Sequence, residues 1–142
     1  MVSENTEEYL EAIWTLREKG VQKIRITDLA DYLCIKNPSA LEKLKKIEKE
    51  NLITYNKNEG IKLTKKGEKR GKEIVRAHRI LESLFDYLEI KEDAMEKLSC
   101  ACEHIEAETV NRICTFLSHP ETCPHGNKIP RGGCCKDTDL QN

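Results

Sequence analysis

The side chains best suited to bind a metal ion gather in the segment Cys100-Ala101-Cys102-Glu103-His104. On a helix, positions 100, 103 and 104 share one face, so Cys100, Glu103 and His104 could point at one ion while Cys102 points elsewhere. A set of thiolate, carboxylate and imidazole differs from the Cys/His sets of structural zinc and favours Fe²⁺ or Mn²⁺. The alternative is a buried, apolar role for Cys100 beside a solvated helix face.

Further acidic and imidazole side chains recur at helical spacing elsewhere. Glu96 lies one turn before Cys100 on the same face, and an earlier segment holds His78 and Glu82 at i, i+4. Near the N-terminus, Glu8 and Glu11 stand at i, i+3. A single pair of this kind is often a surface accident, but three predicted helices that each offer ligands favour a metal site.

An enzyme is the alternative use of the same residues. Cys100, His104 and Glu103 would then be nucleophile, base and orienting group, but all three would lie on one helical face. The sequence places no glycine-rich phosphate loop or oxyanion-hole loop beside them. We therefore predict that the protein is not an enzyme and has no small-molecule substrate.

The cysteine count bears on the compartment and on a second cluster. Seven cysteines, six of them after residue 99, accompany an acidic, polar start without an export signal, which favours reduced thiols and a cytoplasmic location. No apolar run approaches a membrane span. Cys123 and His125 could bind metal together with Cys134 and Cys135; a flexible, thiol-rich tail is the interpretation we favour, because the last two are adjacent and the region is hydrophilic.

The elements that carry these residues begin with a DNA-binding pattern. We expect a first helix over 5–19 and a second helix capped by Thr27. A third should begin at Asn37-Pro38, because Asn suits the N-cap and Pro suits the first helical position. Only residues 34–36 separate the second and third helices, which is typical of a helix-turn-helix. Strand-like runs over 52–55 and 61–64 then flank a polar, glycine-containing tip, and three helices followed by a hairpin predict a winged helix.

The remainder of the chain predicts helices and an irregular end. Thr64 caps a long helix running to about 88, and two more cover about 92–105 and 107–117. Their apolar stripes exceed what one small domain can cover, which indicates a dimerisation surface. We predict a mostly α fold: a winged helix-turn-helix over 1–72, then a helical metal-binding and dimerisation domain over 73–142 whose Cys-rich tail is irregular from about 119.

Charge separates the two halves. Residues 1–72 hold 16 basic and 12 acidic residues, whereas 73–142 hold 8 and 13. Within 36–72 there are 12 basic and 5 acidic residues, so one segment carries the positive excess that phosphate binding needs, although a solvated lysine-rich face fits too. The acid at position 42 is unusual on a DNA-facing helix. The expected DNA contacts lie around the third helix and at the wing: Lys36, Asn37, Ser39, Lys43, Lys46 and Lys57.

Five motifs, in order, resemble one known family. They are Thr6-Glu7-Glu8-Tyr9-Leu10-Glu11-Ala12-Ile13, Leu63-Thr64-Lys65-Lys66-Gly67, Arg76-Ala77-His78-Arg79, Cys100-x-x-Glu103-His104 and Pro124-His125-Gly126-Asn127-Lys128-Ile129-Pro130. Over about residues 5–130 the chain resembles the diphtheria toxin repressor / manganese transport regulator family of iron- or manganese-dependent repressors. It is similar to the short, two-domain form, without the SH3-like third domain of many iron-branch members.

The resemblance implies a function and a ligand set. Loaded with Fe²⁺ or Mn²⁺, a homodimer would bind palindromic operator DNA and control metal homeostasis genes. The principal site would comprise Glu8, Glu11, His78, Cys100, Glu103 and His104, and a possible ancillary site would add Glu82 and Glu96 to His78.

The chain departs from both branches of the family. It combines the acids of the manganese branch on the first helix with the thiolate of the iron branch at Cys100, and Glu96 replaces an ancillary His. We favour Fe²⁺, because thiolate is a poor partner for Mn²⁺. The alternative is a metal-independent winged-helix regulator in which these Cys and His residues only pack.

Overall fold

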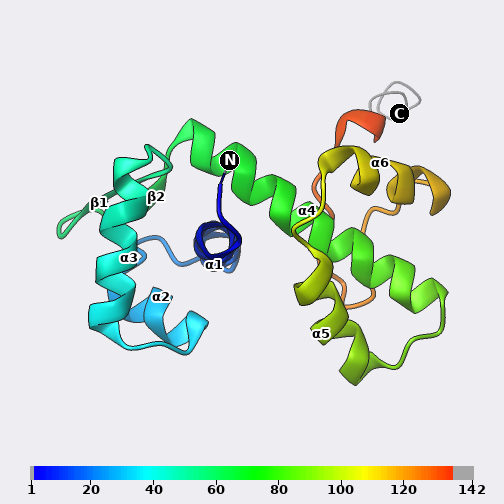
Figure 1. Ribbon diagram of the computed structural model, residues 1–142, viewed down its shortest axis with the longest axis horizontal. Coiled ribbons are helices and arrows are strands. Elements are labelled where there is room, and N and C mark those ends of the chain that lie inside the picture. The colour runs from blue at the N-terminus through cyan, green and yellow to red at the C-terminus, as the bar shows by residue number, and fades with distance from the viewer. Residues whose placement is uncertain (1, 136–142) are drawn as a thin grey trace. The chain divides into compact units, whose positions relative to one another are not determined.

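The computed structural model describes residues 2–135, which divide into two compact units between Lys72 and Glu73. The element order confirms a mostly helical fold in which a winged helix-turn-helix precedes a helical unit (Figure 1). The elements are α1 (Glu4–Glu18), α2 (Ile26–Leu33), α3 (Asn37–Lys49), β1 (Ile53–Asn56), β2 (Gly60–Leu63), α4 (Lys65–Tyr87), α5 (Glu92–Cys102), α6 (Ala107–Phe116) and the 3₁₀ turn η1 (Gly133–Cys135). No helix among these residues is long and apolar enough to cross a membrane.

The first unit is built on an apolar core shared by α1, α2 and α3. Leu10 and Ile13 of α1 pack with Leu29, Leu44 and Ile47, and each is at most 1% exposed. Such burial contributes roughly 1.5–3 kcal/mol per side chain, which stabilises helices too short to persist alone. The predicted apolar stripes of the three helices are therefore the contacts that form this core.

The turn between α2 and α3 closes as the pattern predicts, but both helix starts differ. Cys34 adopts a left-handed conformation at the end of α2. Arg25, not Thr27, precedes α2, because the carboxylate of Asp28 accepts the Arg25 N–H at 2.8 Å. The predicted Thr27 cap is wrong. α3 likewise follows Lys36 and includes Asn37 as its first residue, one position from the predicted cap.

The wing is a two-stranded antiparallel hairpin. β1 and β2 pair from Ile53 with Leu63 to Asn56 with Gly60. The Asn56 side-chain oxygen accepts two backbone N–H groups of the tip at 2.8 Å, which orders the turn. Ile61 donates its N–H to the Ile24 carbonyl at 2.8 Å, so the hairpin is fastened to the segment before α2.

Thr64 caps α4 as predicted. Its hydroxyl oxygen accepts the Gly67 N–H at 3.1 Å, and the hydroxyl donates to the Asn51 carbonyl at 2.7 Å. A Cβ at Gly67 would stand 1.8 Å from the Leu52 carbonyl oxygen. Glycine is thus required where α4 passes the start of the wing.

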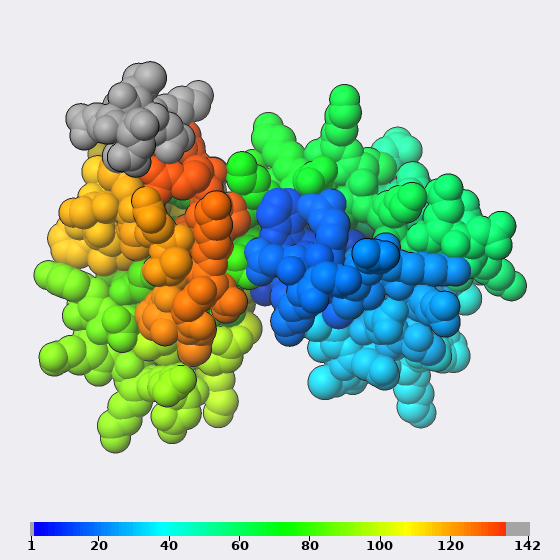
Figure 2. Space-filling view, turned by 180° about the vertical axis from the view of Figure 1, so that it is seen from behind, coloured from blue at the N-terminus to red at the C-terminus, as the bar shows by residue number. Residues whose placement is uncertain are grey.

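In the second unit, α4 after Lys72, α6 and the segment after α6 enclose a smaller core. Ile80 and Val110 are buried in it, together with Cys123, Ile129 and Cys135 of the segment after α6. Figure 2 shows this segment, in orange, on the surface of the unit. The expectation of a flexible, hydrophilic tail is therefore wrong as far as Cys135; residues 136–142 lie outside the described part.

Candidate metal centre

His78 is the central residue of the candidate metal site. It lies on α4 and is 9% exposed, with a carboxylate facing each ring nitrogen. His78 Nδ1 lies 2.7 Å from Glu103 Oε2, and His78 Nε2 lies 2.6 Å from Glu82 Oε1. Glu96 Oε2 is a further 3.6 Å contact of Nε2. The imidazole therefore joins two groups of possible ligands, one through each nitrogen.

The first group consists of His78, Cys100 and Glu103, whose ligand atoms lie within 4.8 Å of one another. α5 ends at Cys102, earlier than the predicted 105, so Glu103 directly follows the helix. Glu103 is nevertheless 2% exposed and turned towards His78, because helical dihedral angles persist at this position. His104 lies beside the group, with Nε2 3.7 Å from Glu103 Oε1. The predicted convergence of Cys100 and Glu103 thus occurs although the helix is shorter than expected.

The two acids of the first helix stand in the other unit. Glu8 and Glu11 lie on α1, with Glu8 exposed and Glu11 partly buried. Their role as ligands stays a prediction. The neighbouring Glu7 has a different role, because it is buried and accepts hydrogen bonds from both Nε and Nη2 of Arg70.

The second group contains His78, Glu82 and Glu96, all three within 4.8 Å of one another. Glu82 also forms a group with Cys123 and His125 of the loop after α6, and His125 Nδ1 lies 2.9 Å from Glu82 Oε2. These two loop residues were not placed beside Glu82 by the sequence. The only signal was the Pro124-His125-Gly126 motif, which has no periodicity that assigns it a neighbour.

The electrostatics of the two groups show an excess of carboxylate around one imidazole. Burial alone would lower the pKa of His78, but hydrogen bonds with Cys100, Glu103 and Glu82 outweigh it and raise the pKa far above the usual range. Burial would raise the pKa of Glu82, yet hydrogen bonds with His78 and His125 lower it to about 2. The Glu82 carboxylate in turn raises the pKa of His125.

This surplus is what a bound cation would neutralise. Glu82 and Glu103 are each at most 3% exposed, so water screens their charges poorly. The raised pKa of His78 favours its protonated form, which balances part of that charge, and a divalent ion can take the place of the proton. The residues present therefore fit a divalent metal, with a thiolate, carboxylates and imidazoles as ligands.

The residues expected to contact DNA lie on α3 and the wing. Lys36, Asn37 and Ser39 are exposed at the start of α3, and Lys57 is exposed at the wing tip. Lys43 is half-buried, and its role stays a prediction with the others.

The acid at position 42 has a partner on its own helix. Lys46 Nζ lies 3.4 Å from Glu42 Oε1 in an exposed pair. This pair reduces the repulsion that Glu42 would exert on phosphate, and it also reduces the free charge of Lys46.

The cluster considered for Cys123, His125, Cys134 and Cys135 does not form as one group. Cys123 and His125 face Glu82, whereas Cys134 and Cys135 lie with Cys114 and His119. The chain turns between these pairs, so nearness in sequence did not predict their partners.

Comparison with known proteins assigns both units. Residues 1–61 match the DNA-binding domain model of the iron dependent repressors, and residues 64–131 match the model of their metal binding and dimerisation domain. The chain is 31% identical over 129 residues to the iron-dependent repressor IdeR of Mycobacterium leprae (strain TN), a match covering 89% of this chain and 56% of that protein. The chain thus spans little more than half the length of that relative.

Shorter relatives and solved structures agree. The chain is 30% identical to the HTH-type transcriptional regulator MntR of Bacillus subtilis (strain 168), over 85% of both chains. The solved structure of the manganese regulator SloR superposes with a TM-score of 0.79 at 33% identity, covering 93% of this chain and 62% of that one. These matches confirm the resemblance. The chain belongs to the iron-dependent repressor family of metal-dependent transcriptional repressors, and it contains their DNA-binding domain and their metal-binding and dimerisation domain.

Proposed function

We propose that this chain, as a homodimer loaded with Fe²⁺ or Mn²⁺, binds palindromic operator sites in double-stranded DNA and represses metal homeostasis genes. The observation that carries the proposal is the convergence of Cys100 and Glu103 on the buried His78. A merely structural histidine needs one or two neutral partners, not several carboxylates and a thiol. The family assignment supplies the DNA-binding half of the argument.

The proposed principal site has two kinds of support. Geometry supports His78, Cys100 and Glu103, with His104 adjacent. The family resemblance alone supports the two acids of α1. The complete proposed set is Glu8, Glu11, His78, Cys100, Glu103 and His104.

An ancillary site would draw on the second group. Glu82 and Glu96 were its expected members, and His125 joins them through its 2.9 Å contact with Glu82. Neutral imidazole offers one lone pair, so His78 can serve one group at a time. The nitrogen that keeps its proton then donates to the carboxylate facing it, which fixes the orientation of the ring.

Fe²⁺ is the metal that the ligands favour. Cys100 is the discriminating residue, because thiolate ligands suit iron better than manganese. The relatives are named for both metals, as an iron-dependent repressor and as a manganese regulator. Cys100→Asp should therefore shift the metal preference of operator binding from Fe²⁺ towards Mn²⁺.

The switch follows from charge. Without a cation, the buried carboxylates of Glu82 and Glu103 disfavour any further negative charge at the site, such as acidic ligands from α1 or a thiolate formed at Cys100. A divalent ion supplies charge stabilisation that turns this repulsion into attraction. If α1 supplies ligands, that attraction would order the DNA-binding units of the homodimer. We expect a coupling of about 1–3 kcal/mol between metal binding and operator binding.

The test is an operator-binding titration under anaerobic conditions with Fe²⁺, Mn²⁺, Zn²⁺ or no metal. We expect tight binding with Fe²⁺ or Mn²⁺, loss of the metal response in Cys100→Ala, and an unchanged response in Cys102→Ala. Cys102 is the matched control because it is an exposed cysteine on the same helix, outside both groups. Equal binding with and without metal would identify the chain as a metal-independent winged-helix regulator and refute the proposal.

A further inference from the structure

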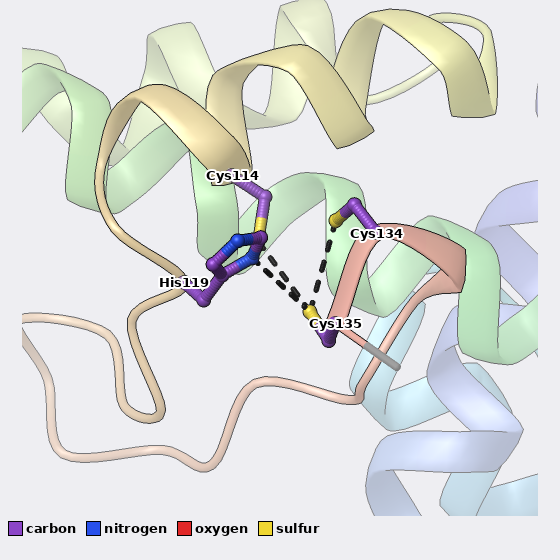
Figure 3. Close-up of side chains that lie close together, drawn as sticks. All are labelled: Cys114, His119, Cys134 and Cys135. Carbon is purple, nitrogen blue, oxygen red and sulfur yellow. Dashed lines mark hydrogen bonds between the residues drawn. The ribbon is translucent and has the colours of Figure 1, made fainter. Parts of the chain in front are cut away.

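Four side chains outside the proposed sensing site form a second cluster in the same unit. Cys114 lies on α6, His119 follows that helix, and Cys134 and Cys135 lie on η1 (Figure 3). Their ligand atoms all lie within 4.8 Å of one another. Three thiols and one imidazole are a set that zinc binds in structural sites.

Four of the six distances between the four ligand atoms match the edges of a tetrahedron around zinc. Cys135 Sγ lies 3.7 Å from both Cys114 Sγ and Cys134 Sγ, and His119 Nδ1 lies 3.5 Å from Cys114 Sγ and 3.6 Å from Cys135 Sγ. With Zn–S of about 2.3 Å and Zn–N of about 2.05 Å, a regular tetrahedron has S–S edges of about 3.8 Å and S–N edges of about 3.6 Å. These four edges have the lengths of a closed four-ligand site, and the two edges that join Cys134 to Cys114 and His119 are at most 4.8 Å.

The backbone after α6 is bent so that His119 reaches the cluster. Ser118 and His119 have φ of 62° and 54°, a left-handed conformation that is unfavourable for residues with a Cβ. The bend returns the chain over the helix end, where the His119 N–H donates to the Cys114 carbonyl at 2.9 Å. Without it, residues five apart would not share a helix face. An interaction that holds both residues would offset this cost.

The surroundings suit a buried, negatively charged metal–thiolate group. Cys114 and Cys135 are 1% and 3% exposed. The buried guanidinium of Arg76 donates from Nη2 to Cys134 Sγ at 3.2 Å. Zn²⁺ with three thiolates and a neutral imidazole has a net charge of −1, which the Arg76 cation balances. A Cβ at Gly132 would stand 2.3 Å from Arg76 Cζ, so the chain passes directly over the guanidinium just before η1.

We propose that Cys114, His119, Cys134 and Cys135 bind one structural Zn²⁺ ion, separate from the metal that controls DNA binding. All four positions would be protein side chains, so no site remains open for a reaction or for exchange with a sensed metal. The ion would fasten η1 and the loop before it to the end of α6. That loop carries His125, which faces Glu82, so the zinc would hold this residue in place for the sensing site.

The test measures the zinc content of the full chain, purified anaerobically and dialysed against a chelator. We expect one equivalent of zinc in the wild type, in Cys100→Ser, which alters the sensing site, and in Cys102→Ser, the matched exposed control. Cys135→Ser and His119→Ala should lose it. Retention of zinc by Cys100→Ser separates this site from the sensing metal.

Replacing Zn²⁺ with Co²⁺ in the wild-type protein tests the proposal directly, even where a variant fails to fold. Three sulfur ligands in a tetrahedron give a thiolate charge-transfer band and intense d–d bands, and His119→Cys should keep these bands while shifting them towards an all-sulfur spectrum. A wild type without bound zinc or these bands would overturn the proposal. So would full zinc in a folded Cys135→Ser, or a disulfide between Cys134 and Cys135 in the freshly isolated protein.

Discussion

Metal binding at His78 should release protons, and the carboxylates around the ring determine how many. In the metal-free protein the raised pKa keeps His78 protonated at neutral pH, because both ring nitrogens face carboxylates at 2.6 and 2.7 Å. A metal ion needs a lone pair on that ring, so it must displace the proton. Because the pKa of His78 is higher in the folded than in the unfolded protein, its protonation stabilises the metal-free fold fully at a pH below the unfolded pKa. This stabilisation is lost only as the pH rises through the folded pKa. Metal binding therefore tightens as pH rises.

The magnitude follows from linkage. Each proton released weakens binding tenfold, or about 1.4 kcal/mol, for each unit by which the pH falls. His78 contributes one proton, and Cys100 adds up to one more because it binds as the thiolate. We expect the affinity of the wild type to change by about 10- to 100-fold per pH unit near neutrality.

The assay is calorimetric titration with Mn²⁺, which does not oxidise as readily as Fe²⁺. The titrations run from about pH 6.5 to about pH 8, in buffers of different ionisation enthalpy. The number of protons released is the slope of the observed heat against that enthalpy. His78→Gln should lower this number by one, whereas Cys102→Ala should leave it unchanged. Heats that do not depend on the buffer, with an affinity constant over this range, would refute the assignment of a protonated His78.

Three further predictions test a buried ion pair, a close backbone contact and a DNA contact of the first unit. Glu7→Gln should lower the free energy of unfolding by about 2–3 kcal/mol in urea, because it weakens a buried pair with Arg70, and should leave metal stoichiometry unchanged. Gly67→Ala should cost about 1–3 kcal/mol, visible as a lower Tm, because its Cβ meets the Leu52 carbonyl; an unchanged Tm would exclude that close approach. Lys43→Ala should reduce the log–log salt slope of operator binding by about 0.9, whereas Lys43→Arg should retain it.

The order of the elements was predictable because burial repeats with helical period. Leu10 and Ile13 on α1, and Leu44 and Ile47 on α3, lie at the spacing that one buried helix face demands. The wing was predictable for a different reason, because a polar tip ending in Gly60 interrupts two strand-like runs. Both signals depend only on residues close together in the chain, so they can be read from a single sequence.

The ends of helices were less predictable, because side chains compete for the same backbone groups. Thr27 is a good capping residue, yet Asp28 reaches back to the Arg25 N–H and starts α2 earlier. At α5 the pattern continues past Cys102, but the chain leaves the helix there and Glu103 turns its carboxylate to His78. A local, exposed carboxylate decides the start of α2, whereas the end of α5 accompanies a buried tertiary contact.

The same contrast explains which site residues the sequence identified. Cys100 and Glu103 lie three residues apart in or next to a helix, and His78 and Glu82 lie four apart, so spacing alone placed each pair on one face. His125 reaches Glu82 from a loop 43 residues later, where no period relates the two positions. Helix-borne ligands are therefore predictable in pairs, whereas a loop-borne ligand needs the tertiary structure.

The same contrast predicts that the two groups around His78 respond differently when the loop after α6 is disturbed. Glu103, just after α5, meets its Nδ1 and groups with Cys100, whereas Glu82 on its own helix meets its Nε2 and also contacts His125 of the loop. The position of that loop depends on the chain between α6 and η1, where His119 and Cys135 lie in the proposed zinc cluster. Loss of zinc from His119→Ala should therefore weaken metal binding that depends on His125 more than binding at Cys100. An equal loss at both groups would show that the loop does not position His125 independently.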